Sequence, residues 1–168
     1  MYTATVHKPV VKPLKRELVI THVFKAPREQ VWKAWTNPGI MIRWWGPKSY
    51  TSPAFKIDLR VGGTYVGCMR TPQGKDIWST GTYRKIVPQE RLVFTDSFAD
   101  EHGNAVPASY YGMTGNWPPE LLVTVIFEEQ GDGTRMTLRH AGIPTDRLRE
   151  LTEVGWKESF HKLARVLG

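Results

Sequence analysis

Residues 145–168 read TDRLRELTEVGWKESFHKLARVLG, and this stretch decides the fold. It predicts one long helix, because it has no proline, Thr145 is a good N-cap residue, and Asp146 places a negative charge in the first turn. The apolar and small residues that share one face of this helix are Leu148, Leu151, Gly155, Trp156, Phe160, Leu163 and Leu167. A helix with so broad an apolar face needs a large partner, and the rest of the chain offers a sheet.

The residues upstream of the helix predict that sheet. Strands are expected at 17–25, 54–59, 64–70, 77–87, 91–98, 121–129 and 134–140. Two short helices are expected after the first strand, at 28–36 and 40–45. The strands follow one another through hairpin turns such as Asp132-Gly133, so the sheet should be antiparallel. The predicted fold class is α+β, with no βαβ alternation.

Positive charge is concentrated at the N-terminus. The chain has 168 residues and a formal net charge of +7, and residues 1–16 contain four basic residues and no acidic one. The remaining 19 basic and 16 acidic residues nearly balance, and no basic stripe or DNA-binding motif is present. We therefore expect a flexible basic arm at 1–16, one domain at 17–168, and no nucleic-acid partner.

Composition also argues against several classes of protein. No apolar stretch reaches the roughly 18 residues of a membrane span, and no secretory leader is expected. Cys68 is the only cysteine, so no intrachain disulfide forms and a cytoplasmic location is expected. The five histidines lack metal-binding spacing, and neither a phosphate loop nor a serine-nucleophile motif occurs, so we expect no metal and no cofactor.

Alternation along the strands predicts which side chains face the helix. Most members of this inward set are apolar, but three are polar, namely His22, Asp96 and His140. Two interpretations fit these three residues. Either each lies near a strand end or finds a backbone partner, or together they orient a ligand in an otherwise apolar cavity.

Several short stretches, taken in order, carry a family likeness. They are residues 24–32 (FKAPREQVW), 43–47 (RWWGP), 58–63 (DLRVGG), 88–93 (PQERLV), Gly133-Thr134 followed by Leu138 and His140, and Gly155-Trp156. Together they resemble the START/Bet v 1-like (SRPBCC) superfamily, and within it the branch named for activators of the Hsp90 ATPase. The likeness covers the chain from Glu17 to its C-terminus.

The resemblance implies a helix-grip fold, in which a curved seven-stranded antiparallel sheet wraps around the last helix and leaves a cavity. It makes the first and seventh strands neighbours, which would bring His22 and His140 within a few residues of each other. It implies binding of a small hydrophobic molecule as the default role, although the superfamily also contains cyclases and aromatases. Hsp90 is not an expected partner, because the co-chaperones that name the branch carry an additional N-terminal domain that is not found in this sequence.

Three functions follow as hypotheses. The first is binding of a small hydrophobic or aromatic ligand, with residues 110–117 of the long connection at 99–120 as a lid. The side chains expected to form the ligand site are Trp44, Trp45, Tyr65, Trp78, Phe94, Phe98, Tyr110, Met113, Trp117, Trp156 and Phe160. The second is a cyclase-, aromatase- or hydrolase-like enzyme that uses His22, Asp96 and His140. The third is a chaperone-linked protein-interaction module, and a homodimer is compatible with all three.

Overall fold

The computed structural model describes residues 17–168, and the predicted basic arm at 1–16 lies outside them. The elements are β1 (Leu18–Phe24), α1 (Arg28–Thr36), α2 (Pro38–Met41), β2 (Phe55–Ile57), β3 (Thr64–Arg70), β4 (Asp76–Val87), β5 (Arg91–Ala99), the 3-10 helix η1 (Ala108–Tyr111), β6 (Leu121–Gln130), β7 (Gly133–Ala141) and α3 (Asp146–Leu167). The predicted order of one strand, two short helices, six strands and a long helix is confirmed.

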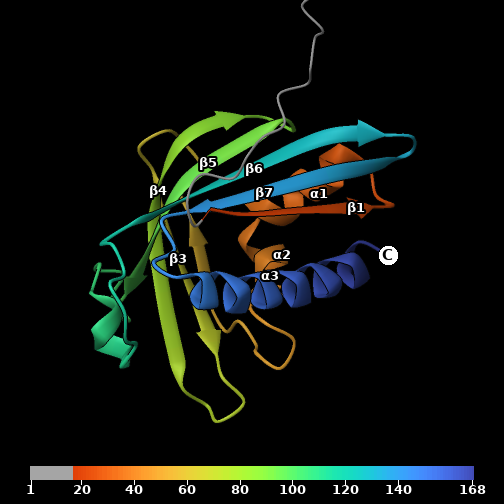
Figure 1. Ribbon diagram of the computed structural model, residues 1–168. Coiled ribbons are helices and arrows are strands. Elements are labelled where there is room, and N and C mark those ends of the chain that lie inside the picture. Colours follow the sequence, from red (N-terminus) through yellow and green to blue (C-terminus); the bar gives the residue numbers. More distant parts are fainter. Residues whose placement is uncertain (1–16) are drawn as a thin grey trace, which may run out of the picture.

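The seven strands form one antiparallel sheet in the order β1-β7-β6-β5-β4-β3-β2. The sheet curves around α3, and the connection between β5 and β6 lies beside the N-terminal end of that helix (Figure 1). This is the helix-grip arrangement that the resemblance implied. None of the helices in residues 17–168 is both long enough and apolar enough to cross a membrane.

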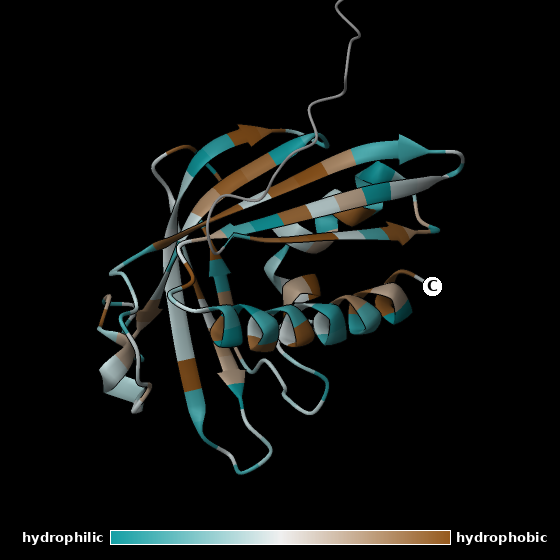
Figure 2. Cartoon of the chain, in the orientation of Figure 1, coloured by the Kyte–Doolittle hydropathy of each residue, from teal (hydrophilic) through white to brown (hydrophobic). Residues whose placement is uncertain are grey.

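The strands carry hydrophobic residues on the face that covers α3. Bands of hydrophobic and hydrophilic residues alternate along β5, β6 and β7 in Figure 2. On β7, Met136 and Leu138 are fully buried, whereas Arg135 between the turn and Met136 is exposed. Burying each large apolar side chain contributes about 1.5–3 kcal/mol, so the alternation holds the register of the sheet.

The helix α3 is packed unevenly along its length. Thr145 caps it as predicted, because its hydroxyl accepts a hydrogen bond from the backbone N–H of Leu148 at 3.1 Å. Its buried residues, Ser159, Phe160 and Leu163, all lie in the second half. In the first half, Leu148 and Trp156 are only half-buried. The first half of α3 is therefore held less firmly against the sheet.

Leu151 is not on the buried face of α3, where we expected it, and is 56% exposed. At about 100° per residue, Leu151 points about 140° away from Trp156, which faces the sheet. Thr152 occupies the inward position instead and is half-buried. The first half of α3 therefore presents a narrower apolar face to the sheet than the sequence predicted.

Lys162 ties the second half of α3 to the loop that follows α2. Its ammonium group donates to the backbone carbonyls of Gly46 at 3.0 Å, Pro47 at 3.2 Å and Tyr50 at 3.0 Å. An ammonium has three hydrogens, so these three contacts satisfy it fully. Lys162 is not among the residues predicted to share the buried face, yet it is half-buried and anchors the helix.

The second short helix begins and ends earlier than predicted, at Pro38–Met41 instead of 40–45. The side chain of Asn37 accepts a hydrogen bond from the N–H of Gly39 at 2.8 Å and so caps the helix. Pro38 fits the first helical position, where its missing N–H is not needed. The pair Trp44-Trp45 therefore follows the helix and lies on a turn.

Candidate ligand-binding site

The aromatic residues next to α2 belong mainly to the core. Trp44 is fully buried, donates its indole N–H to the carbonyl of Ala34 at 3.0 Å, and packs edge to face against Trp35. Phe160 of α3 is also fully buried. We predicted both Trp44 and Phe160 as ligand contacts, but their environment is that of core residues.

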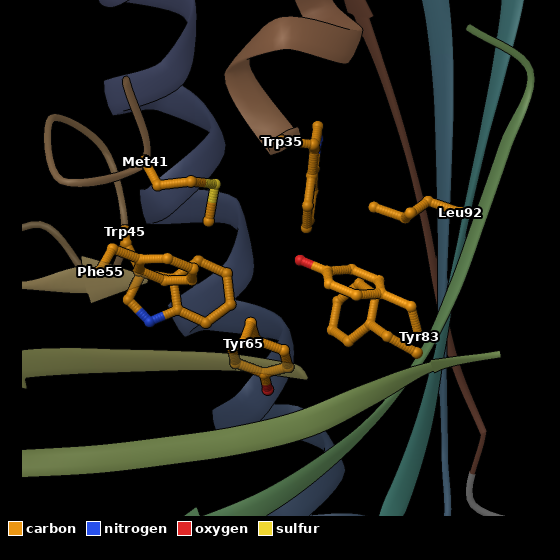
Figure 3. A pocket seen from close by; sticks show the side chains of 8 residues that line it. Trp35, Met41, Trp45, Phe55, Tyr65, Tyr83 and Leu92 are labelled. Atoms are coloured by element: carbon orange, nitrogen blue, oxygen red, sulfur yellow. The ribbon is translucent and has the colours of Figure 1, made fainter. Parts of the chain in front are cut away.

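A small aromatic cavity lies between the sheet and the segment that contains α1 and α2. Its volume is about 10 Å³, which is room for about one water molecule. It is lined by Trp35, Met41, Trp45, Phe55, Tyr65, Tyr83, Leu92 and Phe94 (Figure 3). Alternation along a strand does not decide whether such a cavity is open, because side-chain volumes do.

Two polar groups border this small cavity. The indole N–H of Trp45 is buried and has no hydrogen-bond partner among the described residues. The hydroxyl of Tyr83 points toward Trp35, whereas the hydroxyl of Tyr65 points away from it (Figure 3). Burial raises the pKa of Tyr83, so the phenol stays protonated. The cavity is thus lined mainly by apolar and aromatic residues, two of which carry a donor.

Asp96, on β5, is the centre of a chain of polar side chains from four elements. The hydroxyl of Tyr65, on β3, donates to its Oδ1 at 2.9 Å. The Nε2 atom of His140, on β7, lies 3.4 Å from its Oδ2. The indole N–H of Trp156, on α3, donates to Nδ1 of His140 at 3.1 Å. We call these four residues the Asp96 site.

The contact with Trp156 sets the tautomer of His140. An indole N–H can only donate, so Nδ1 must accept, and the neutral imidazole carries its hydrogen on Nε2. That Nε2 is buried, faces Asp96, and makes no hydrogen bond of good geometry with the described residues. Both ring nitrogens are thus directed at protein groups, which leaves neither one available as a general base.

Gly81 allows Tyr65 to reach Asp96 across β4. Tyr65 and Gly81 are paired across β3 and β4. A Cβ atom at Gly81 would lie 2.7 Å from Cε1 of Tyr65 and 1.7 Å from the carbonyl oxygen of Thr95. Burial, and next the charge of Asp96, hold the pKa of Tyr65 well above its ordinary value. Tyr65 therefore acts as a neutral donor.

The structure does not bring His22 to the Asp96 site. β1 and β7 are neighbours, as expected, but His22 pairs with Met136 whereas His140 pairs with Leu18. This offset of four residues corresponds to about 13 Å along the strands. His22 instead packs near Phe160 and His161, with ring centres 6.1 Å away in each case. Burial, and next the charge of His161, lower the pKa of His22.

Trp78 does not face α3, and its predicted place in the cavity wall is wrong. It pairs with Cys68 on β3 and with Ala99 on β5. Tyr83, five residues along the same strand, lines the cavity. Residues at odd spacing in a strand point to opposite faces, so Trp78 lies on the other side of the sheet.

The long connection between β5 and β6 packs against the end of β5. Phe98 contacts Tyr111 and Trp117, with ring centres 6.0 and 5.9 Å away. The hydroxyl of Tyr111 accepts from the backbone N–H of Trp78 at 3.0 Å and donates to the carbonyl of Ala99. Sequence reasoning selected Tyr110, which is 58% exposed, and missed Tyr111. The only signal in the sequence was the pair Tyr110-Tyr111. It does not show which of the two tyrosines packs against the sheet.

The same connection reaches the first half of α3. A Cβ atom at Gly115 would contact the side chain of Leu148 at 3.5 Å, and Trp117 packs against the hydrophobic core. Met113 is half-buried. An open groove of about 680 Å³ lies outside this contact, lined by Gly115, Asn116, Pro118, Gly142, Ile143, Pro144 and Thr145. No ionisable side chain lines the groove, so it offers no acid–base chemistry.

Within residues 17–168, no three His, Cys, Asp or Glu side chains come together in a way that could hold a metal ion. Cys68 is buried, and burial raises the pKa of its thiol to about 11. A thiol with so high a pKa is a poor nucleophile. The polar chemistry near the helix is therefore that of the Asp96 site.

The chain matches a known protein family and several solved structures. The family model described as "Activator of Hsp90 ATPase homolog 1-like protein" matches residues 25–168. No curated protein matches the chain. A solved structure from Arthrobacter aurescens is 28% identical, has a TM-score of 0.74, and is matched over 94% of this chain and 91% of that one.

Two further solved structures have the same fold. A protein of Chromobacterium violaceum is 25% identical with a TM-score of 0.73, matched over 92% of this chain and 98% of that one. The AHSA1 protein of Silicibacter pomeroyi is 24% identical with a TM-score of 0.70, matched over 89% of this chain and 95% of that one. At 24% identity, the likeness to the Silicibacter pomeroyi protein concerns the fold alone.

Proposed function

We propose that this chain, which belongs to the Activator of Hsp90 ATPase homolog 1-like family, binds a small hydrophobic molecule between its sheet and the first half of α3. The observation that carries the proposal is the aromatic cavity, whose lining residue Trp45 packs against Trp156 of α3 and carries a buried, unpartnered indole N–H. A buried donor without an acceptor costs about 1–3 kcal/mol. A ligand that brings apolar surface and one acceptor would remove that cost.

Binding requires the cavity to expand, because ligand sites commonly occupy about 300–1,000 Å³. The uneven packing of α3 supports a route for this expansion. Its second half is anchored by Phe160, Leu163 and the three carbonyl contacts of Lys162. Its first half, which includes Gly155 and Trp156, has no fully buried residue. We infer that the first half moves outward and that Trp156 swings with it.

The enzyme hypothesis finds less support. His140 has both ring nitrogens directed at protein groups, and His22 lies about 13 Å along the strands from it. A general base must reach the proton that it removes. Asp96 alone keeps an oxygen that accepts no hydrogen bond from the described residues, so the site fits recognition better than proton transfer.

A thermal-shift screen against long-chain fatty acids and polycyclic aromatic compounds tests the proposal. A ligand present at about 100 times its Kd stabilises the fold by about 2.7 kcal/mol, which should raise the Tm of a domain of this size by about 5–10 °C. Binding should also change the tryptophan fluorescence, because Trp35 and Trp45 line the cavity and Trp156 packs against Trp45.

Two variants locate the site. Trp45→Phe removes the unpartnered N–H and should weaken binding of ligands that carry an acceptor. Trp78→Phe makes the same change on the opposite face of the sheet and should leave binding unaltered. The proposal is wrong if no compound raises the Tm by more than about 1 °C, or if both variants affect binding equally.

A further inference from the structure

The carboxylate of Asp96 has no strong cationic partner among residues 17–168. Within the described residues, its side-chain polar contacts are the neutral phenol of Tyr65 and the imidazole of His140. No Lys or Arg nitrogen of the described residues lies within 4.0 Å of it. The acidic side chains Glu17, Asp76, Glu120 and Glu129, by contrast, each pair with an arginine. The Asp96 side chain is 25% exposed, so a ligand can approach it.

The hydrogen-bonding capacity of this carboxylate is not used up. Oδ1 accepts one hydrogen bond from Tyr65. Oδ2 faces the Nε2 of His140 at 3.4 Å, which is longer than a good N–H···O bond. His140 is 7% exposed, and its Nε2 is buried and unpartnered. The site therefore combines a buried donor, Nε2 of His140, with an unused lone pair on Oδ2 of Asp96.

Aromatic side chains neighbour the residues beside this carboxylate, and the hydroxyl of Tyr65 contacts it directly. Trp156 contacts His140 directly, and Phe98 lies two residues from Asp96 on the same strand and therefore on the same face. Trp117 packs edge to face against Phe98 at 5.9 Å. A carboxylate among aromatic faces is the chemistry that recognises an organic cation, through charge and cation–π attraction together.

We infer that the Asp96 site binds the protonated amine of a hydrophobic ligand. This rests on the proposed function, because it names the polar group of the molecule whose apolar part would enter the aromatic cavity. A protonated amine donates to the free Oδ2 and neutralises the carboxylate. A neutral hydroxyl can donate but carries no charge, and a carboxylate ligand is repelled by Asp96.

Three probes that share one ring system test the inference: naphthylmethylamine, naphthylmethanol and naphthoic acid. Each is titrated into the full chain by calorimetry and by tryptophan fluorescence. The amine should bind about tenfold more tightly than the alcohol, because a hydrogen bond to a charged group exceeds a neutral one by about 1 kcal/mol or more. The acid should bind most weakly, and added salt should weaken the amine most.

Variants then assign the preference to the residue. Asp96→Asn keeps the size of the side chain and an acceptor for Tyr65. In this variant the amine and the alcohol should bind about equally tightly. Asp132→Asn makes the same change in the exposed β6–β7 turn and should preserve it. If Asp96→Asn does not fold, the salt dependence of the unaltered chain is the second test: added salt should weaken binding of the amine clearly more than binding of the alcohol, and equal weakening would overturn the inference.

The outcomes separate the inference from the function on which it rests. If the alcohol or the acid binds the unaltered chain as tightly as the amine, or if Asp96→Asn retains the preference, the inference is overturned while ligand binding stands. If none of the probes binds, the inference is also overturned, and the thermal-shift screen decides the proposed function by itself.

Discussion

At the scale of single residues, the Asp96 site depends on a glycine, Gly81, which has no side chain. Tyr65 and Asp96 lie on strands that are separated by β4, and the ring of Tyr65 passes over Gly81 to reach the carboxylate. A larger residue at this position would collide with main-chain atoms of β5 and not only with the flexible end of a side chain. Gly81 is therefore required by the close approach of its neighbours.

Gly81→Ala should lower the free energy of unfolding by about 2–4 kcal/mol, because its Cβ would lie 1.7 Å from the Thr95 carbonyl oxygen and the strands would have to separate. Urea unfolding measures the change. Gly155→Ala is the matched control: its Cβ meets only Pro47, at an ordinary 3.6 Å, and alanine favours the helix by about 1 kcal/mol. Equal destabilisation by both changes would contradict this account.

At the scale of elements, α3 combines a fixed half with a loosely packed half. The fixed half contains every buried residue of the helix and the ammonium group of Lys162. The other half covers the Asp96 site with Trp156 and meets the β5–β6 connection through Leu148. Low burial gives a segment a low free energy of local opening, which is the property that a ligand entrance needs.

Lys162→Met should destabilise the protein by about 1–3 kcal/mol, because three backbone carbonyls lose their common donor. Hydrogen exchange should show faster exchange in the second half of α3, which the unaltered protein protects. Lys157→Met removes an exposed ion pair with Glu153 and should change stability by no more than about 0.5 kcal/mol. A Lys162→Met variant as stable as the Lys157→Met variant would rule out the anchor.

At the scale of the whole molecule, the two ends of the described chain meet. β1 pairs with β7 at one edge of the sheet, and its His22 packs near Phe160 and His161 of α3. The contact joins residues separated by most of the chain, so it forms only when the fold closes. The protonation of His22 is consequently coupled to the stability of the complete domain.

Burial and the neighbouring His161 lower the pKa of His22 below its ordinary 6.5. The folded state therefore binds fewer protons than the unfolded state, and stability is full above pH 6.5 and falls as the pH drops through 6.5 toward the lowered value. His22→Gln should flatten this part of the profile in urea unfolding between about pH 5 and pH 8. His102→Gln, at an exposed residue, should leave the slope unchanged. An unaltered slope in His22→Gln would show that another group is responsible.

The sequence predicted the elements more accurately than the site. The helix at 28–36, the strand at 64–70 and the cap at Thr145 agree with the structure, because local patterns and capping residues determine them. Of the three polar residues predicted to face inward, Asp96 and His140 come together and His22 does not. The difference is one of strand register, which hydrophobic alternation leaves open by any even number of residues.

The sequence by itself determined the fold class, the order of the elements and the faces of most strands, because these follow from periodicity along a single segment. Tertiary structure alone decided that Tyr65, Asp96, His140 and Trp156 come together in one site. It also decided that the aromatic cavity beside α2 has a volume of only about 10 Å³. The physical reason is that convergence depends on register and curvature among four elements, and empty volume depends on how whole side chains pack.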